Sequence, residues 1–112
     1  MVTTASDLSH VFSTFVELIS KSVRVEALIL FGSHVNGSPS EWSDIDIAVI
    51  SPDFEGLPLW QRQRMISRAT IGREPSLAPI GYPSSEYHNP GRHSFLREII
   101  RTGRVVYPPP TQ

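Results

Sequence analysis

Two short apolar runs, joined by a turn and followed by a pair of acids, constrain the fold of this chain most strongly. Each run has the length and composition of a β-strand, and together they cover residues 27–31 and 45–50. Gly32 and Ser33 follow the first run directly, and after ten further residues Asp44 and Asp46 mark the start of the second. The sequence therefore predicts two strands, a Gly-Ser turn after the first, and two carboxylates at the beginning of the second.

The spacing of Asp44 and Asp46 places both carboxylates on one face of the second strand. Residues two apart in a strand point to the same side and lie about 6 to 7 Å apart. Carboxylates this close raise each other's pKa unless a cation lies between them, and Mg²⁺ prefers hard oxygen ligands. Ile45, Ile47 and Val49 have the opposite parity and are expected to face the core. We therefore predict a metal site at the two acids.

Gly32 and Ser33 have the properties of a phosphate-binding turn. Glycine allows a tight turn and close approach to a ligand, while Ser33 offers a hydroxyl at the start of a short helix whose free N–H groups suit anions. Gly37 and Pro39 are expected to end that helix, and His34 is expected to face solvent. No Gly-Lys-Ser or Gly-Lys-Thr follows, so this is not a Walker loop. Alone the pair would equally suit an ordinary turn, and its coupling to the two acids favours phosphate binding.

These residues resemble a known family. The segments that carry the resemblance are Leu30-Phe31-Gly32-Ser33, then Gly37, then Ser43 to Val49, with supporting segments at residues 79–87 and 95–107. They resemble the nucleotidyltransferase superfamily that includes DNA polymerase beta, and the short chain resembles its minimal branch. The resemblance implies an α+β fold in which helices flank a small mixed sheet of three to four strands.

The resemblance also implies an activity. The chain is expected to move a nucleoside monophosphate, either AMP from ATP or another nucleotide from its triphosphate, to a hydroxyl acceptor, with Gly32 and Ser33 on the phosphates. Asp44 and Asp46 would hold two Mg²⁺ ions, one activating the attacking oxygen and one stabilising the leaving pyrophosphate. In the minimal branch the acceptor is often a tyrosine on a partner toxin of small helical fold, as in HEPN–MNT systems. An antitoxin-type, ATP-binding, Mg²⁺-dependent nucleotidyltransferase is therefore expected.

One position departs from the family pattern. The family usually has a third carboxylate directly before the position matched by Pro79, and this chain has Ala78 there. Glu74 has the same strand parity but lies about 13 Å away along the strand, and Glu86 would reach inward only if its segment folded back. Two hypotheses remain open. The intact Gly-Ser turn and acid pair favour a working transferase, and Ala78 favours a degenerate nucleotide-binding module that acts as an antitoxin or regulator by partner binding.

Composition is consistent with one small domain over residues 1–107 and a proline-rich tail over residues 108–112. The chain has no cysteine, and no run approaches the roughly 18 apolar residues of a membrane helix, so a cytoplasmic protein without a membrane partner is expected. Residues 1–59 carry a net charge of −6 and residues 60–112 one of +5. The pI of 6.4 argues against binding of bulk nucleic acid.

Periodicity predicts the remaining elements. A helix over residues 6–22, with a Thr4/Asp7 capping box, is indicated by an apolar stripe of Leu8, Val11, Phe12, Phe15, Leu18 and Ile19. Further helices are expected over residues 59–70 and 94–102, the second burying Phe95, Leu96, Ile99 and Ile100. A third strand lies between Pro75 and Pro83, and its prolines indicate an edge position that would permit a homodimer. A short last strand is expected at residues 105–107.

Overall fold

The computed structural model describes residues 5–36, 44–72 and 76–109. Thr4, Gly37, Pro39, Ser43 and Glu74 of the sequence analysis lie outside these ranges. The elements follow in this order: α1 (Ala5–Ile19), β1 (Ala27–Phe31), α2 (Ser33–Asn36), β2 (Ile45–Ser51), the 3₁₀ helix η1 (Pro52–Phe54), α3 (Leu59–Ser67), β3 (Leu77–Pro83), α4 (Ser84–His88), α5 (Phe95–Thr102) and β4 (Arg104–Tyr107). Within the described ranges, no helix is both long enough and apolar enough to cross a membrane.

The four strands form one mixed sheet in the order β3-β2-β1-β4. β1 runs antiparallel to both β2 and β4, while β2 and β3 are parallel and are connected through α3. β3 is an edge strand with Pro79 inside it, as expected for a residue that cannot donate to a ladder. The predicted α+β class and the edge position of the third strand are both confirmed.

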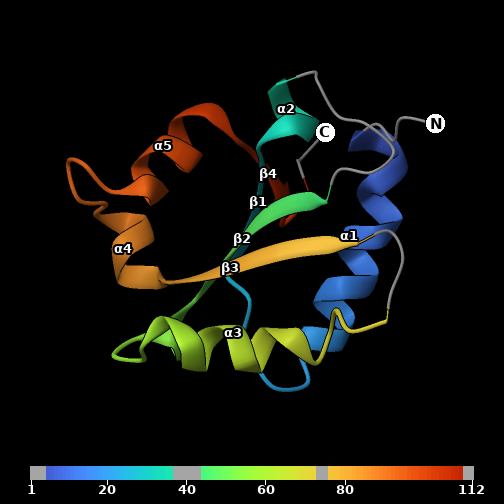
Figure 1. Cartoon of the computed structure of the whole chain (residues 1–112), viewed down its shortest axis with the longest axis horizontal. Helices are drawn as coiled ribbons and strands as arrows, with labels where there is room; N and C mark the ends of the chain where they lie inside the picture. Colours follow the sequence, from blue (N-terminus) through green and yellow to red (C-terminus); the bar gives the residue numbers. More distant parts are fainter. Residues whose placement is uncertain (1–4, 37–43, 73–75, 110–112) are drawn as a thin grey trace.

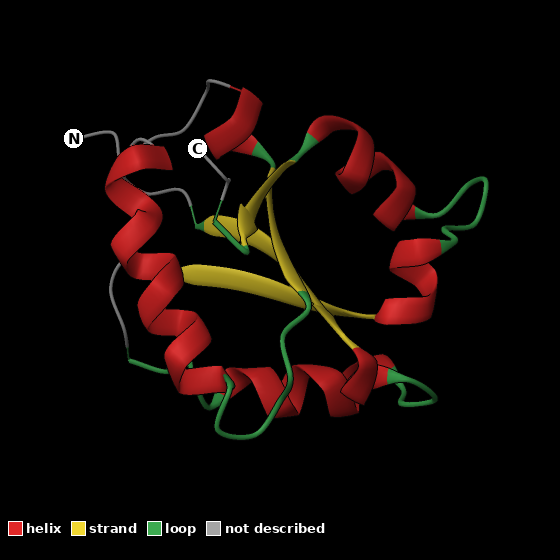
Figure 2. Cartoon of the chain, turned by 180° about the vertical axis from the view of Figure 1, so that it is seen from behind, coloured by secondary structure: helices red, strands yellow, loops and turns green. Residues whose placement is uncertain are grey.

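Helices cover both faces of this sheet. Figure 1 shows α4 and α5 on one side of the sheet and α1 on the other, with α3 running across one end, and Figure 2 gives the reverse view. The core beneath α1 and α3 includes Leu8, Phe12, Phe15, Ile19, Leu28, Leu30, Ile45, Ile47, Val49, Phe54 and Ile66. The core beneath α5 includes Ala27, Ile29, Ala48, Ile50, Tyr82, Leu96 and Ile99. The central strands β1 and β2 are therefore buried on both faces, which explains their continuous apolar runs.

α5 differs from its predicted burial. Its N-terminus is capped by Ser94, whose Oγ accepts a hydrogen bond from the N–H of Arg97 at 3.1 Å. Leu96 and Ile99 are buried as expected, but Phe95 is 58% exposed and Ile100 is 38% exposed. The prediction that these two residues are buried is wrong, because the short helix packs only one narrow stripe on the sheet.

The outer edge of β3 is closed by side chains of α3. The amide of Gln63 donates from Nε2 to the carbonyl of Pro79 at 2.8 Å, and its Oε1 accepts from the N–H of Gly81 at 2.9 Å. Arg62 adds a bond from its guanidinium to the carbonyl of Gly81 at 2.6 Å. A homodimer formed through this edge would have to break these bonds.

Candidate active site

Asp44 directly precedes β2, and Asp46 is the second residue of β2, on the sheet face that α4 and α5 cover. Asp46 has the parity of Ala48 and Ile50, which belong to the core beneath α5. Asp44 is exposed and Asp46 is half-buried. The alternate residues Ile45, Ile47 and Val49 are buried on the opposite face, as the predicted register requires. The fold thus places Asp46 at the edge of the packed core, with Asp44 close enough for its charge to affect it.

The charge of Asp44 acts on the carboxylate of Asp46. The pKa of Asp46 is raised, first by burial and second by the negative charge of Asp44, while His34 has the opposite influence. Burial and a like charge both disfavour the ionised carboxylate, and a cation between the acids would relieve both effects. The pair is therefore electrostatically suited to a positively charged ligand.

Gly32 provides the space that Asp46 occupies. Its φ of +79° lies in the left-handed region, where residues with a Cβ are strained. A Cβ built on Gly32 would lie 3.2 Å from Cγ of Asp46 and 3.3 Å from its Cβ, and it would collide with Oδ2. Ser33 then opens α2, and the N–H of Val35 bonds back to the carbonyl of Gly32 at 3.0 Å. The Gly-Ser turn and the second acid are therefore packed together directly.

His34 is a residue of this site that the sequence did not identify. It was expected to face solvent, but it is half-buried, and within the described residues its Nδ1 has no hydrogen-bond partner. Its influence on the pKa of Asp46 places it near the acids. Its position directly after Gly32 and Ser33 is the sequence feature that could have identified it as a site residue. A single histidine without the spacing of a metal-binding motif is weak evidence for such a role.

The neighbouring strand places Ala78 directly beside Asp46 in the parallel register. Paired residues of adjacent strands lie about 4.8 Å apart and point to the same face, so position 78 adjoins the acid pair and offers no ligand. Glu86 is exposed on α4, which begins after the far end of β3. It lies near Tyr82, whose pKa is raised first by burial and second by the charge of Glu86. Within the part of the chain that the structure describes, no group of three His, Cys, Asp or Glu residues could hold a metal ion.

Two carboxylates nevertheless fit a hard divalent cation. Mg²⁺ is usually bound by one or two carboxylates, and water and substrate phosphates complete its shell. Asp44 is exposed, which leaves the solvent side of the pair accessible to such ligands. The donor set is therefore adequate for an ion that arrives together with a nucleotide.

Phe31 lies beside Asp46, and Phe95 packs against Phe31. Phe31 of β1 pairs with Asp46 of β2, so the two side chains lie next to each other on one face. The ring of Phe95 meets that of Phe31 edge to face, with centroids 5.8 Å apart and an interplanar angle of 81°. Because Phe95 is 58% exposed, it offers an apolar surface next to Phe31, the strand neighbour of Asp46. Such a surface can accept a nucleobase by stacking.

Comparison with known proteins identifies the family. The sequence profile described as "Polymerase beta, Nucleotidyltransferase" matches residues 14–111. A crystal structure from Sulfolobus solfataricus, described as a "putative nucleotidyltransferase", has a TM-score of 0.60 and 24% sequence identity and supports the fold; the match covers 72% of this chain and 71% of that chain. No protein of curated function matches the sequence significantly. Since the matched region spans the Gly-Ser turn, both acids and all four strands, the chain belongs to the polymerase beta nucleotidyltransferase family.

Proposed function

We propose that this protein transfers a nucleoside monophosphate, AMP from ATP, to a hydroxyl acceptor. The contact between Gly32 and Asp46 carries this proposal, because it joins the phosphate-binding turn and the carboxylate pair into one site. Membership of a nucleotidyltransferase family supports the class of reaction. The coupled charges of Asp44 and Asp46 support the requirement for a divalent cation.

In the proposed reaction the acceptor oxygen attacks the α-phosphorus of the nucleotide. A new oxygen–phosphorus bond forms and the acceptor hydroxyl loses its proton to solvent. The bond from the α-phosphorus to the bridging oxygen breaks, and pyrophosphate leaves with that electron pair. Gly32 and Ser33 would hold the phosphates, while Asp44 and Asp46 would hold two Mg²⁺ ions. Bound Mg²⁺ would supply the charge that activates the attacking oxygen and neutralises the leaving group. The chain itself contributes mainly positioning and fixed charge.

The exposed ring of Phe95 is the proposed contact for the base. It is linked to the acid pair through Phe31, the neighbour of Asp46 in the sheet. Base stacking on an aromatic ring tolerates any base, so this contact favours nucleotide binding without selecting ATP. The proposed acceptor is a tyrosine of a partner toxin of small helical fold.

Ala78 supports a second candidate function, a nucleotide-binding module that has lost turnover and neutralises or regulates its partner by contact. A carboxylate in that position would act directly beside Asp46. Loss of a general base typically reduces the rate by about 10²- to 10⁴-fold, which is compatible with slow transfer as well as with none. The two candidates therefore differ in turnover and agree on nucleotide binding.

A transfer assay separates them. The purified protein is incubated with Mg²⁺ and each radiolabelled nucleoside triphosphate, alone and with the product of the neighbouring gene, and label transfer and pyrophosphate release are followed. Transfer that is lost in Asp44→Ala and kept in Glu17→Gln, which alters an exposed acid of α1, would establish the enzyme. Nucleotide binding without transfer would support the regulatory module. Unchanged nucleotide and Mg²⁺ binding in the Asp44→Ala, Asp46→Ala double variant would contradict both.

A further inference from the structure

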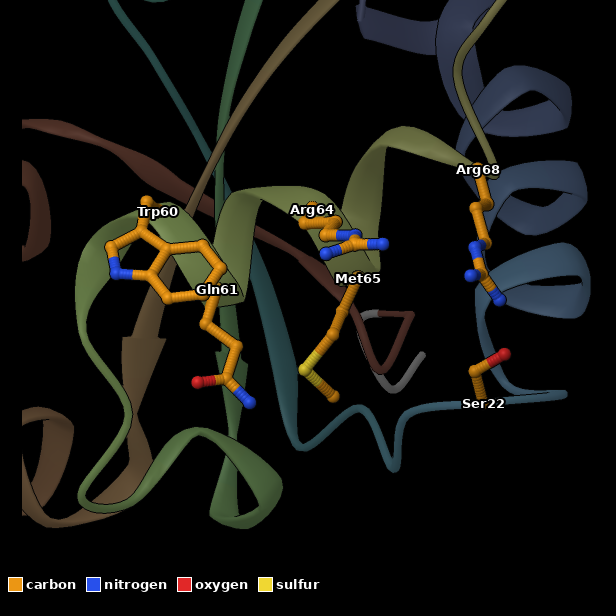
Figure 3. A pocket seen from close by; sticks show the side chains of 6 residues that line it. All are labelled: Ser22, Trp60, Gln61, Arg64, Met65 and Arg68. Atoms are coloured by element: carbon orange, nitrogen blue, oxygen red, sulfur yellow. The ribbon is translucent and has the colours of Figure 1, made fainter.

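A groove lies between α3 and the turn that follows α1, on the other sheet face from Asp44 and Asp46. It consists of two adjoining cavities of about 310 and 260 Å³ that share Ser22, Met65 and Arg68. Figure 3 shows the larger cavity, with Trp60 near one end, Arg68 at the other, and Arg64 and Met65 between them. None of the residues of the proposed transfer site lines either cavity.

The groove is positively charged. Lys21, Arg64 and Arg68 line it, all three are exposed, and its lining contains no acid. In the ranges 5–36, 44–72 and 76–109, no ion pair joins any of the three to a carboxylate. A ligand that fills the groove would therefore meet three cations whose charge is not neutralised within the described structure, and an acidic ligand complements them.

The groove also has an apolar component that follows the helical repeat. Trp60, Arg64 and Arg68 are spaced four residues apart along α3 and its C-cap, so they form one ridge, and Gln61 and Met65 form the row beside it. Trp60 is 65% exposed, and Met65 is half-buried near Leu18 and Ala69. A large side chain that is mostly exposed at the end of a groove is a typical anchor point for a partner.

We propose that this groove binds an acidic amphipathic helix of a partner protein. Arg64 and Arg68 lie about 6 Å apart on their helix, which is the spacing of two carboxylates at i and i+4 on an opposing helix. The apolar face of that helix would pack on Trp60 and Met65, as in other complexes in which a helix lies in a groove. The phosphates of a nucleic acid would contact the cations but would make no use of the apolar side chains of Trp60 and Met65.

Peptide selection on the full chain tests this proposal. A library of displayed random 16-residue peptides is selected on the wild-type protein, and the enriched sequences are made with a fluorescent label for anisotropy measurements. We expect enrichment of acidic peptides with carboxylates four residues apart and a large apolar residue. Their affinity should fall at least tenfold in the Arg64→Glu, Arg68→Glu variant. Arg97→Glu, which reverses an exposed arginine on α5, should leave the affinity unchanged.

Three results would each overturn the proposal. The first is that no peptide binds the wild type more tightly than the charge-reversed variant, and the second is that the enriched peptides contain no acids. The third is that a mixed-sequence oligonucleotide binds at Arg64 and Arg68 more tightly than any peptide. The thermal midpoint of the variant checks that it folds, and Arg64→Gln serves as a milder replacement. Nucleotide binding at the acid site should be the same in the wild type and in these variants. A result that contradicts peptide binding in the groove is thereby distinguished from a result that contradicts the proposed nucleotidyl transfer.

Tryptophan fluorescence locates the bound peptide. The chain has two tryptophans, so Trp42→Phe leaves Trp60 as the single emitter. Packing of an apolar helix face on the exposed indole should shift its emission to shorter wavelength in step with the anisotropy. Binding that leaves the emission of Trp60 unchanged would place the peptide elsewhere and overturn the assignment of the groove.

Discussion

Ala78 of β3 is the direct neighbour of Asp46 of β2 in the parallel part of the sheet. The two side chains point to the same face, and because Ala78 carries no acid, Asp46 has no carboxylate beside it on the neighbouring strand. Position 78 therefore bears on whether this family member turns over its substrate or only binds it.

Ala78→Asp is expected to raise the rate of nucleotidyl transfer by about 10²- to 10⁴-fold, the usual contribution of a positioned general base. The new carboxylate would stand about 4.8 Å from the strand position of Asp46, within reach of the same cation. The measurement is label transfer from the preferred nucleotide under single-turnover conditions. Ala78→Asn has the same shape without the charge and should show no gain, and equal rates in the two variants would contradict the role given to this position.

Gly32→Ala is expected to weaken both the fold and the site. The positive φ alone costs about 1 to 2 kcal/mol in an alanine residue, and here the added methyl group also collides with the carboxylate of Asp46. Gly56→Ala is the matched control, because Gly56 has a φ of +73° and nothing within 4 Å of an added Cβ. Urea unfolding should show the larger loss for Gly32→Ala, and calorimetry should show weaker Mg²⁺ binding for it alone. Equal losses would mean that the contact with Asp46 is unimportant.

Phe95→Ala is expected to reduce nucleotide affinity by about 5- to 150-fold, which corresponds to about 1 to 3 kcal/mol of stacking. The effect on unfolding should be small, because most of the side chain is exposed. The measurement is titration with a fluorescent ATP analogue in the presence of Mg²⁺. Ile100→Ala truncates another partly exposed apolar residue of the same helix and should leave the affinity unchanged. An unchanged affinity in Phe95→Ala would remove this ring from the nucleotide site.

The ion pair between Arg24 and Asp53 makes part of the free energy of unfolding depend on pH. Asp53 accepts from the backbone N–H of Arg24 at 2.8 Å and from its guanidinium at 2.8 and 3.1 Å, and the guanidinium bond is the main reason that the pKa of Asp53 is lowered. Because the pKa of Asp53 is lower in the folded state, the pair stabilises the fold fully when the pH is above the unfolded-state pKa of about 3.9. This stabilisation is lost as the pH falls through the folded-state pKa.

Asp53→Asn should therefore be less stable than the wild type at pH 7, and the difference should shrink steadily below about pH 4. Thermal unfolding of both proteins across this range is the measurement. Glu17→Gln, at an exposed acid of α1, should show no such convergence. A difference between Asp53→Asn and wild type that stays constant down to pH 2 would show that the charge of Asp53 contributes nothing.

The sequence predicted the central strands because their evidence is local. β1 begins and ends at the predicted residues, and β2 extends one residue beyond its predicted run, since strands buried on both faces have continuous apolar sequences. The face of Asp46 follows from its alternation with the buried residues Ile45 and Ile47, while the metal site at Asp44 and Asp46 stays a prediction. The α+β class and the family followed from the same short motifs.

The remaining features depend on residues that are distant in the sequence. Arg24 and Asp53 are 29 positions apart, and nothing near either one indicates the other. The exposure of Phe95 depends on how α5 lies over the sheet, and the burial of His34 depends on the turn that precedes it. Hydrophobic periodicity describes which side of an element is apolar, but it cannot show how much of that side its neighbours cover.

The amide of Gln63 occupies the place beside β3 that the backbone of a fifth strand would take. α3 thus ends the sheet with one side chain that imitates a peptide group, one donor and one acceptor at strand spacing. A segment from elsewhere can extend the sheet on that side only after α3 has withdrawn this amide. Enlargement of this small fold by additional strands would therefore require α3 to be repositioned first.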